Sequence, residues 1–191
     1  MIKLTFIAAI FAFSASFTQG ATALTNEDYF KKGMKLSKNK QEEKEFLYIK
    51  AAETGSANYQ LWLANKYHFG SDGFKKSDKD AAKWFRKAAE QGHPEAMMRY
   101  AQYKLNGWGV PQSNQEALKW LKKVATYDYD VSRLSDKDDA KSCAAEAQFM
   151  IGIIYAYKLN DYSQAEYWIQ QSANNGYIKA KEFMKEISKH K

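Results

Sequence analysis

One pattern of residues occurs twice in the middle of the chain, and it constrains the fold more than any other feature. Residues 81–89 read AAKWFRKAA and residues 117–125 read ALKWLKKVA, so the two copies begin 36 residues apart. Self-similarity at such a period is typical of stacked helical hairpins, in which each repeat buries its apolar face against the next. Ten glycines and two prolines in 191 residues agree with a mostly helical chain. We therefore predict an all-α solenoid.

Apolar spacing, capping residues and glycine stops divide the chain into pairs of helices. Ser77, Ser113 and Ser163 each precede an acid by three residues, which predicts a capping box at the start of the second helix of three pairs. The solenoid is expected to cover residues 24–187 and to hold about four repeats, with a C-terminal capping helix. The helices are expected at about 27–36, 44–53, 57–69, 78–91, 95–105, 114–125, 144–157, 164–174 and 178–187.

Residues 126–142 interrupt the period, and we interpret them as an inserted acidic loop. Asp128, Asp130, Ser132, Asp136 and Asp139 fall at places 1, 3, 5, 9 and 12 of a calcium-loop register. That register needs a glycine at place 6 and a glutamate at place 12, and here place 6 is arginine. We therefore expect a solvated loop without a metal; a protrusion that contacts a partner is its functional alternative.

The N-terminus is typical of a secretory signal peptide. A lysine at position 3 precedes an almost wholly apolar run over residues 4–17, and small residues follow it. Residues 1–20 are the predicted signal, with cleavage near 20 or 23 and a periplasmic or secreted mature protein. A membrane anchor is the alternative, but the run is shorter than the ~20 residues that span a bilayer, so we expect no stable membrane span after signal removal. The lone Cys143 excludes an intrachain disulfide.

Neither the net charge nor any sequence motif indicates an enzyme. The formal net charge of +7 becomes +6 once Lys3 is removed with the signal, because no acid precedes Glu27. That excess favours an anionic surface or an acidic protein partner, and no nucleic-acid-binding motif accompanies it. The histidines, at 68, 93 and 190, share no metal-ligand spacing. The Ser-x-x-Lys spacing of Ser37 and Lys40 lacks an accompanying Lys-Thr-Gly motif. No catalytic residue, metal or cofactor is therefore expected.

These residues resemble the Sel-1-like repeat, a relative of the tetratricopeptide repeat. Residues 79–92 are similar to the second helix of that repeat, residues 104–111 to its Gly-x-Gly-Val loop, and residues 147–155 to its first helix. The first repeat departs from the pattern, and Lys104 stands where the family usually has tyrosine. The resemblance implies a right-handed α-solenoid and an adaptor rather than an enzyme. Exported bacterial members are implicated in envelope scaffolding, host contact and immunity to secreted toxins.

A solenoid of this kind exposes the first helix of each pair, helix A, on its concave side. Aligning three copies on Gly70, Gly107 and Lys158 produces rows on one helix face, spaced at i, i+4 and i+7. These rows hold large aromatics, methionine and arginine, which dominate interface hot spots. The alternative is that the aromatics pack between adjacent repeats. The predicted partner-binding residues are Trp62, Lys66, Phe69, Arg99, Tyr103, Met150, Ile154 and Tyr157.

The sequence thus predicts a non-catalytic protein-protein interaction module of the cell envelope or periplasm. An immunity protein that neutralises a secreted antibacterial toxin is the nearest alternative. A cell-wall-directed or lipid-directed enzyme would need converging carboxylates that no motif supplies. Adhesion to anionic surfaces through the basic charge would depend steeply on salt.

Overall fold

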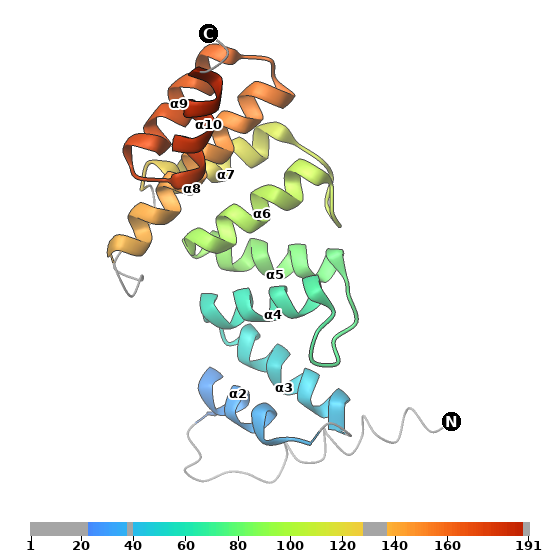
Figure 1. The fold of residues 1–191 in the computed structure, drawn as a ribbon. Helices are drawn as coiled ribbons and strands as arrows, with labels where there is room; N and C mark the ends of the chain where they lie inside the picture. The colour runs from blue at the N-terminus through green and yellow to red at the C-terminus, as the bar shows by residue number, and fades with distance from the viewer. Residues whose placement is uncertain (1–22, 38–39, 128–136, 189–191) are drawn as a thin grey trace.

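The computed structural model describes residues 23–37, 40–127 and 137–188, and these residues form helices and no strand. Successive helices stack side by side in Figure 1, with α2 and α10 at opposite ends, so the predicted all-α solenoid is confirmed. In this described part of the chain, no helix combines the length and the apolar character needed to cross a membrane. The helices are α2 (Asn26–Lys35), α3 (Gln41–Glu53), α4 (Ala57–Phe69), α5 (Asp78–Glu90), α6 (Pro94–Asn106), α7 (Asn114–Ala125), α8 (Lys137–Lys158), α9 (Tyr162–Asn174) and α10 (Ile178–Ser188).

The helices pair as four antiparallel hairpins, α2–α3, α4–α5, α6–α7 and α8–α9. We call the first helix of each hairpin helix A and the second helix B. One apolar core runs through the hairpins from Tyr48 to Ile154. The last helix, α10, packs on α9 and encloses a smaller core around Ile169 and Ala180. A solenoid needs such a cap, because its last repeat has no neighbour to cover its apolar face.

Alanines and bulky side chains alternate on the buried faces of the B helices. In α5, Ala81, Trp84, Phe85, Ala88 and Ala89 are each at most 3% exposed, as the sequence pattern predicts. Their spacing places them on one side of the helix. The small alanine side chains let neighbouring helices approach closely, and the rings fill the remaining space, which is how a repeat too small for its own core gains one.

The same hydrogen bond joins helix A to helix B in three repeats. The backbone N–H groups of Ser77, Ser113 and Asp161 donate to helix A carbonyls of Tyr67, Lys104 and Tyr155, at 2.9, 2.8 and 3.0 Å. All three donors are N-caps whose side chains accept from the backbone N–H three residues on, so Ser77 and Ser113 cap their helices as predicted. The predicted capping boxes are not completed there, because the backbone N–H groups of Ser77 and Ser113 donate to helix A rather than to the acidic side chains. The cap predicted at Ser163 is wrong. The loop between α8 and α9 is shorter than the loops of the two preceding hairpins. The bond from the Asp161 backbone N–H to Tyr155 therefore places Asp161, rather than Ser163, at the start of α9.

The predicted loop over residues 126–142 is wrong in its last part. Helix α8 begins at Lys137, so residues 137–142 form its first turns, while residues 128–136, which hold most of the calcium-like register, lie outside the described residues. Ala140, Ala144 and Ala147 are each at most 3% exposed and stand at i, i+4 and i+7. This alanine stripe extends the buried face of α8 upstream, and alanine strongly favours helix.

Candidate protein-interaction surface

The eight predicted partner-binding residues differ widely in exposure. Phe69 and Tyr157 are 67% and 68% exposed, whereas Tyr103 and Ile154 are only 1% and 3% exposed. Predicting Tyr103 and Ile154 as contact residues was therefore wrong, because both side chains are buried in the apolar core. The remaining four are partly exposed: Trp62, Lys66, Arg99 and Met150.

Trp62 belongs to an aromatic cluster between the first two repeats. Its ring lies 5.0 Å from that of Phe30 and 4.5 Å from that of Tyr48, both at steep angles. The Lys66 ammonium lies 5.1 Å from the Trp62 ring and also pairs with Asp72. Packing between adjacent repeats, the alternative interpretation of the aromatic rows, thus accounts for much of Trp62.

Tyr103 joins two repeats from below the surface. Its hydroxyl shares a hydrogen bond of 2.7 Å with Nδ1 of His68, the residue before the exposed Phe69. Its ring lies 5.3 Å from Phe85 in the core and 5.5 Å from Trp108, which it meets edge-on. A buried hydroxyl that keeps a partner avoids the cost of an unsatisfied polar group. Tyr103 therefore fixes the positions of His68 and Trp108.

Above Tyr103 lies a group of three rings, the partly exposed His68 and the exposed Phe69 and Trp108, which we call the aromatic patch. Phe69 is 67% and Trp108 41% exposed, and the His68 ring lies 4.6 Å from Phe69 and 6.2 Å from Trp108. Helix α4 supplies two of these rings, and the loop after α6 supplies the third. Trp108 is not among the predicted contact residues, because it lies inside the glycine loop rather than in the helix A rows.

Burial and basic neighbours both lower the pKa of His68. Partial burial, followed by Arg99 and Lys76, lowers the pKa of its imidazole, and Asp78 opposes this shift only in part. His93 occupies the N-cap position of α6, but its side chain makes no capping bond. Burial lowers the pKa of His93 more strongly than the nearby Glu95 raises it. In both residues the lowered pKa favours the neutral imidazole.

We expect the protein to lose stability as the pH falls from 7.5 to 5.5. Both histidines have folded pKa values below the ordinary value of about 6.5. The unfolded chain therefore binds more protons than the native state below that pH, so the free energy of unfolding falls until the pH passes the folded pKa values. The shifted carboxyls do not contribute, because the pKa values of Asp28, Asp72, Glu116 and Asp161 lie below their ordinary acidic range.

Urea unfolding at the two pH values measures this loss. A His68→Asn/His93→Asn variant should lose less stability across the same interval, although it starts from a less stable native state. An equal loss in both proteins would show that other groups cause the pH dependence.

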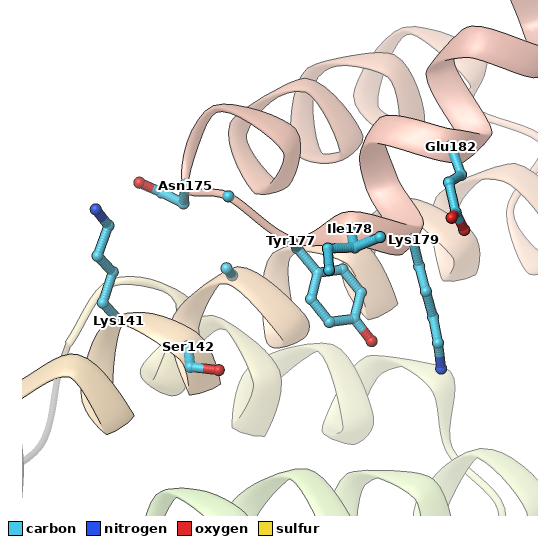
Figure 2. A pocket seen from close by; sticks show the side chains of 9 residues that line it. Lys141, Ser142, Asn175, Tyr177, Ile178, Lys179 and Glu182 are labelled. Atoms are coloured by element: carbon cyan, nitrogen blue, oxygen red, sulfur yellow. The ribbon is translucent and has the colours of Figure 1, made fainter.

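A hollow of about 680 Å³ lies at the other end of the molecule, between the start of α8 and the turn from α9 to α10. Figure 2 shows Lys141 and Ser142 on one side of it and Tyr177, Ile178 and Glu182 on the other. The lining brings together no pair of carboxylates and no histidine or cysteine. In the part of the chain that the structure describes, no group of three histidine, cysteine or acidic residues could hold a metal ion.

Comparisons with known proteins agree with the repeat architecture. The Sel1 repeat family matches residues 57–93, 94–126 and 145–177, more than half of the chain. The first hairpin, α2–α3, lies outside these matches, as expected from its departure from the pattern.

Two crystal structures share the fold. One is a protective antigen present in uropathogenic Escherichia coli strains, with a TM-score of 0.61 and 21% identity over 82% of this chain and 32% of the antigen. The other is a Sel1 repeat protein from Oxalobacter formigenes, with a TM-score of 0.53 and 24% identity over 73% of this chain and 95% of that protein.

A sequence relative is chitin synthase regulatory factor 4 of Schizosaccharomyces pombe, which is 27% identical over 134 residues. The match covers 70% of this chain and 19% of that protein, so the chain spans about a fifth of the relative's length. Sel1 repeats mediate protein-protein interaction, and the family consists in general of non-catalytic scaffolds. With three matched repeats and a solenoid of helical hairpins, the chain belongs to the Sel1 repeat family.

Proposed function

We propose that this protein is an exported, non-catalytic interaction module that binds a partner protein at the aromatic patch. The observation that carries the proposal is the exposure of Phe69 and Trp108 above a buried, hydrogen-bonded Tyr103. Aromatic residues are enriched at protein interfaces, and tryptophan is among the residues that most often form hot spots. The partly exposed Arg99, whose charge acts on His68, adds a second side chain of the hot-spot type.

Rigid presentation reduces the free-energy cost of binding. Ordering a side chain on association costs roughly 0.5–1.5 kcal/mol. The rings of the patch are already held by ring contacts and by the bond between His68 and Tyr103. A partner therefore meets a surface that needs little rearrangement.

The proposed location is the periplasm or the exterior of the cell. The support is the N-terminal sequence, where a lysine, an apolar run and small residues follow one another as in a secretory signal. In that compartment a chain with one cysteine depends on its core for stability, and the core of this solenoid is continuous over most repeats. An envelope component is therefore the proposed class of partner.

Affinity capture from an envelope fraction tests the proposal. We expect the wild-type protein to retain a partner and a Phe69→Ala/Trp108→Ala variant to bind it at least tenfold more weakly, the scale of hot-spot losses. A Tyr162→Ala/Tyr167→Ala variant is the matched control, because it removes two rings that are 70% and 54% exposed on α9. Thermal unfolding establishes that each variant is folded.

Two observations decide the outcome: which variant loses the partner, and what the captured partner is. Equal retention by the patch variant and the wild type would overturn the assignment of the site. A captured toxin or hydrolase would indicate an immunity role, whereas a component of envelope machinery would indicate a scaffold.

A further inference from the structure

A trough lies between the B helices α5 and α7, and helix α6 forms its floor. It consists of two adjoining hollows of about 300 and 370 Å³ that share Arg86, Glu90 and Tyr100 as lining residues. Tyr100 and Lys104 from α6 are only 5% and 7% exposed, so they form the base rather than the rim. None of the predicted partner-binding residues of the A helices lines this trough.

Positive charge dominates the trough. Seven cationic side chains line it, against two carboxylates. The two carboxylates are already paired, Glu90 with Arg86 at 2.7 Å and Glu116 with Lys104 at 2.6 Å. This leaves five lysines with no carboxylate partner among the ion pairs of the described residues, namely Lys79, Lys83, Lys87, Lys119 and Lys123.

Tryptophan rings hold three of these lysines in place. The ammonium groups of Lys83 and Lys87 lie 5.3 and 4.6 Å from the Trp84 ring, and that of Lys123 lies 5.3 Å from the Trp120 ring. Cation–π contacts of this kind contribute about 0.5–1 kcal/mol at exposed sites. These contacts already restrict the lysine side chains. Binding of an anion therefore costs less conformational entropy than it would if the lysines were free to move.

We infer that this trough binds an extended acidic segment of a partner protein. The inference adds a second surface to the one proposed above, and the loop between α6 and α7 contributes to both, Trp108 to the aromatic patch and Val110 to the trough. Unpartnered lysines supply complementarity to carboxylates. The carboxylates of Glu90 and Glu116 can accept hydrogen bonds from peptide N–H groups.

The same two glutamates disfavour a phosphodiester chain. Such a chain offers acceptors but no backbone donors, and its regular negative charges would face both carboxylates. The dimensions also suit a short peptide. Lys79 and Glu90 stand eleven residues apart on α5, which is about 16 Å of helix. An extended peptide advances about 3.3 Å per residue, so the trough accommodates about five residues.

Fluorescence anisotropy with a fluorescein-labelled hexaglutamate peptide tests the inference. We expect saturable binding at low salt, weakened at least tenfold in a Lys83→Glu/Lys119→Glu variant. The matched control is Lys158→Glu/Lys181→Glu, which makes the same change in net charge at two exposed positions outside the trough. It should weaken binding less than threefold. The Phe69→Ala/Trp108→Ala variant should bind the peptide as the wild type does, which separates this test from that of the aromatic patch.

Three outcomes would overturn the inference. Absence of hexaglutamate binding by the wild type would remove its basis. Equal weakening in the two charge-reversal variants would reduce the effect to net charge. Tighter binding of a labelled oligothymidylate with the same number of charges, lost in the Lys83→Glu/Lys119→Glu variant, would assign the trough to phosphodiesters. Circular dichroism confirms that each variant keeps its helices.

Discussion

Replacing Gly109 by alanine is expected to lower the free energy of unfolding by about 2–4 kcal/mol. Gly109 has a φ of +65°, where an L side chain is strained by about 1–2 kcal/mol. A Cβ atom there would lie 2.5 Å from the carbonyl carbon and oxygen of Asp78 and from the amide nitrogen of Lys79. These are backbone atoms in the first turn of α5, so relieving the overlap would move a helix of the preceding repeat.

Gly107 in the same loop is the matched control. Its φ of +70° imposes a similar strain, but the nearest atom to an added Cβ is the Cβ of Gln112, at an ordinary 3.4 Å. A Gly107→Ala variant should therefore lose only about 1–2 kcal/mol. Urea unfolding followed by circular dichroism compares the two variants. If both lost the same stability, the close approach of the loop to α5 would contribute nothing beyond backbone strain.

The sequence predicted the helices well where several signals agree. Helix α4 has the predicted bounds, because an apolar face ends at Gly70, which adopts the left-handed conformation that closes many helices. The stripe of α5 is buried as predicted, because its alanines and aromatics recur at helical spacing. These properties depend on neighbours within one helix, which a sequence displays directly.

The exposure of the helix A rows could not be predicted in the same way. Periodicity shows which residues share a face, but the next repeat decides which of them are covered. Phe69 and Tyr103 were predicted to belong to one surface, yet Tyr103 lies beneath Trp108 and bonds to a histidine 35 residues away. That partner comes from another repeat, so no local spacing identifies it.

Buried amides between repeats were also missed. Gln60 donates to the carbonyl of Ala52 and accepts from Gln91, and Gln148 repeats the arrangement with Ala125 and Asn175. The two glutamines occupy equivalent positions, ten residues before Gly70 and Lys158. In sequence they are polar residues on a helix, which usually face solvent. Only the stacking shows that they close the ends of the preceding helices.

Replacing Gly152 by alanine is expected to lower the free energy of unfolding by about 1–3 kcal/mol, although alanine is the better helix former by about 1 kcal/mol. Gly152 lies in the C-terminal half of α8, facing α9. A Cβ atom there would overlap Cγ1 of Ile169 and lie 3.1 Å from the carbonyl oxygen of Ala165. Because α8 and α9 form one hairpin and enclose the C-terminal core, separating them also weakens the contacts of α10.

A double-mutant cycle with Ile169→Ala distinguishes this overlap from a general intolerance of the site. Ile169→Ala alone should cost about 2–5 kcal/mol, because it leaves a cavity at a residue that is 2% exposed. In the double variant the new Cβ of residue 152 occupies part of that cavity. We therefore expect a loss smaller than the sum of the two single losses by about 1–2 kcal/mol, within the range measured for residues in contact. Losses that simply add would show that Gly152 is required for a reason other than its contact with Ile169, and the close packing of α8 on α9 would not explain the glycine.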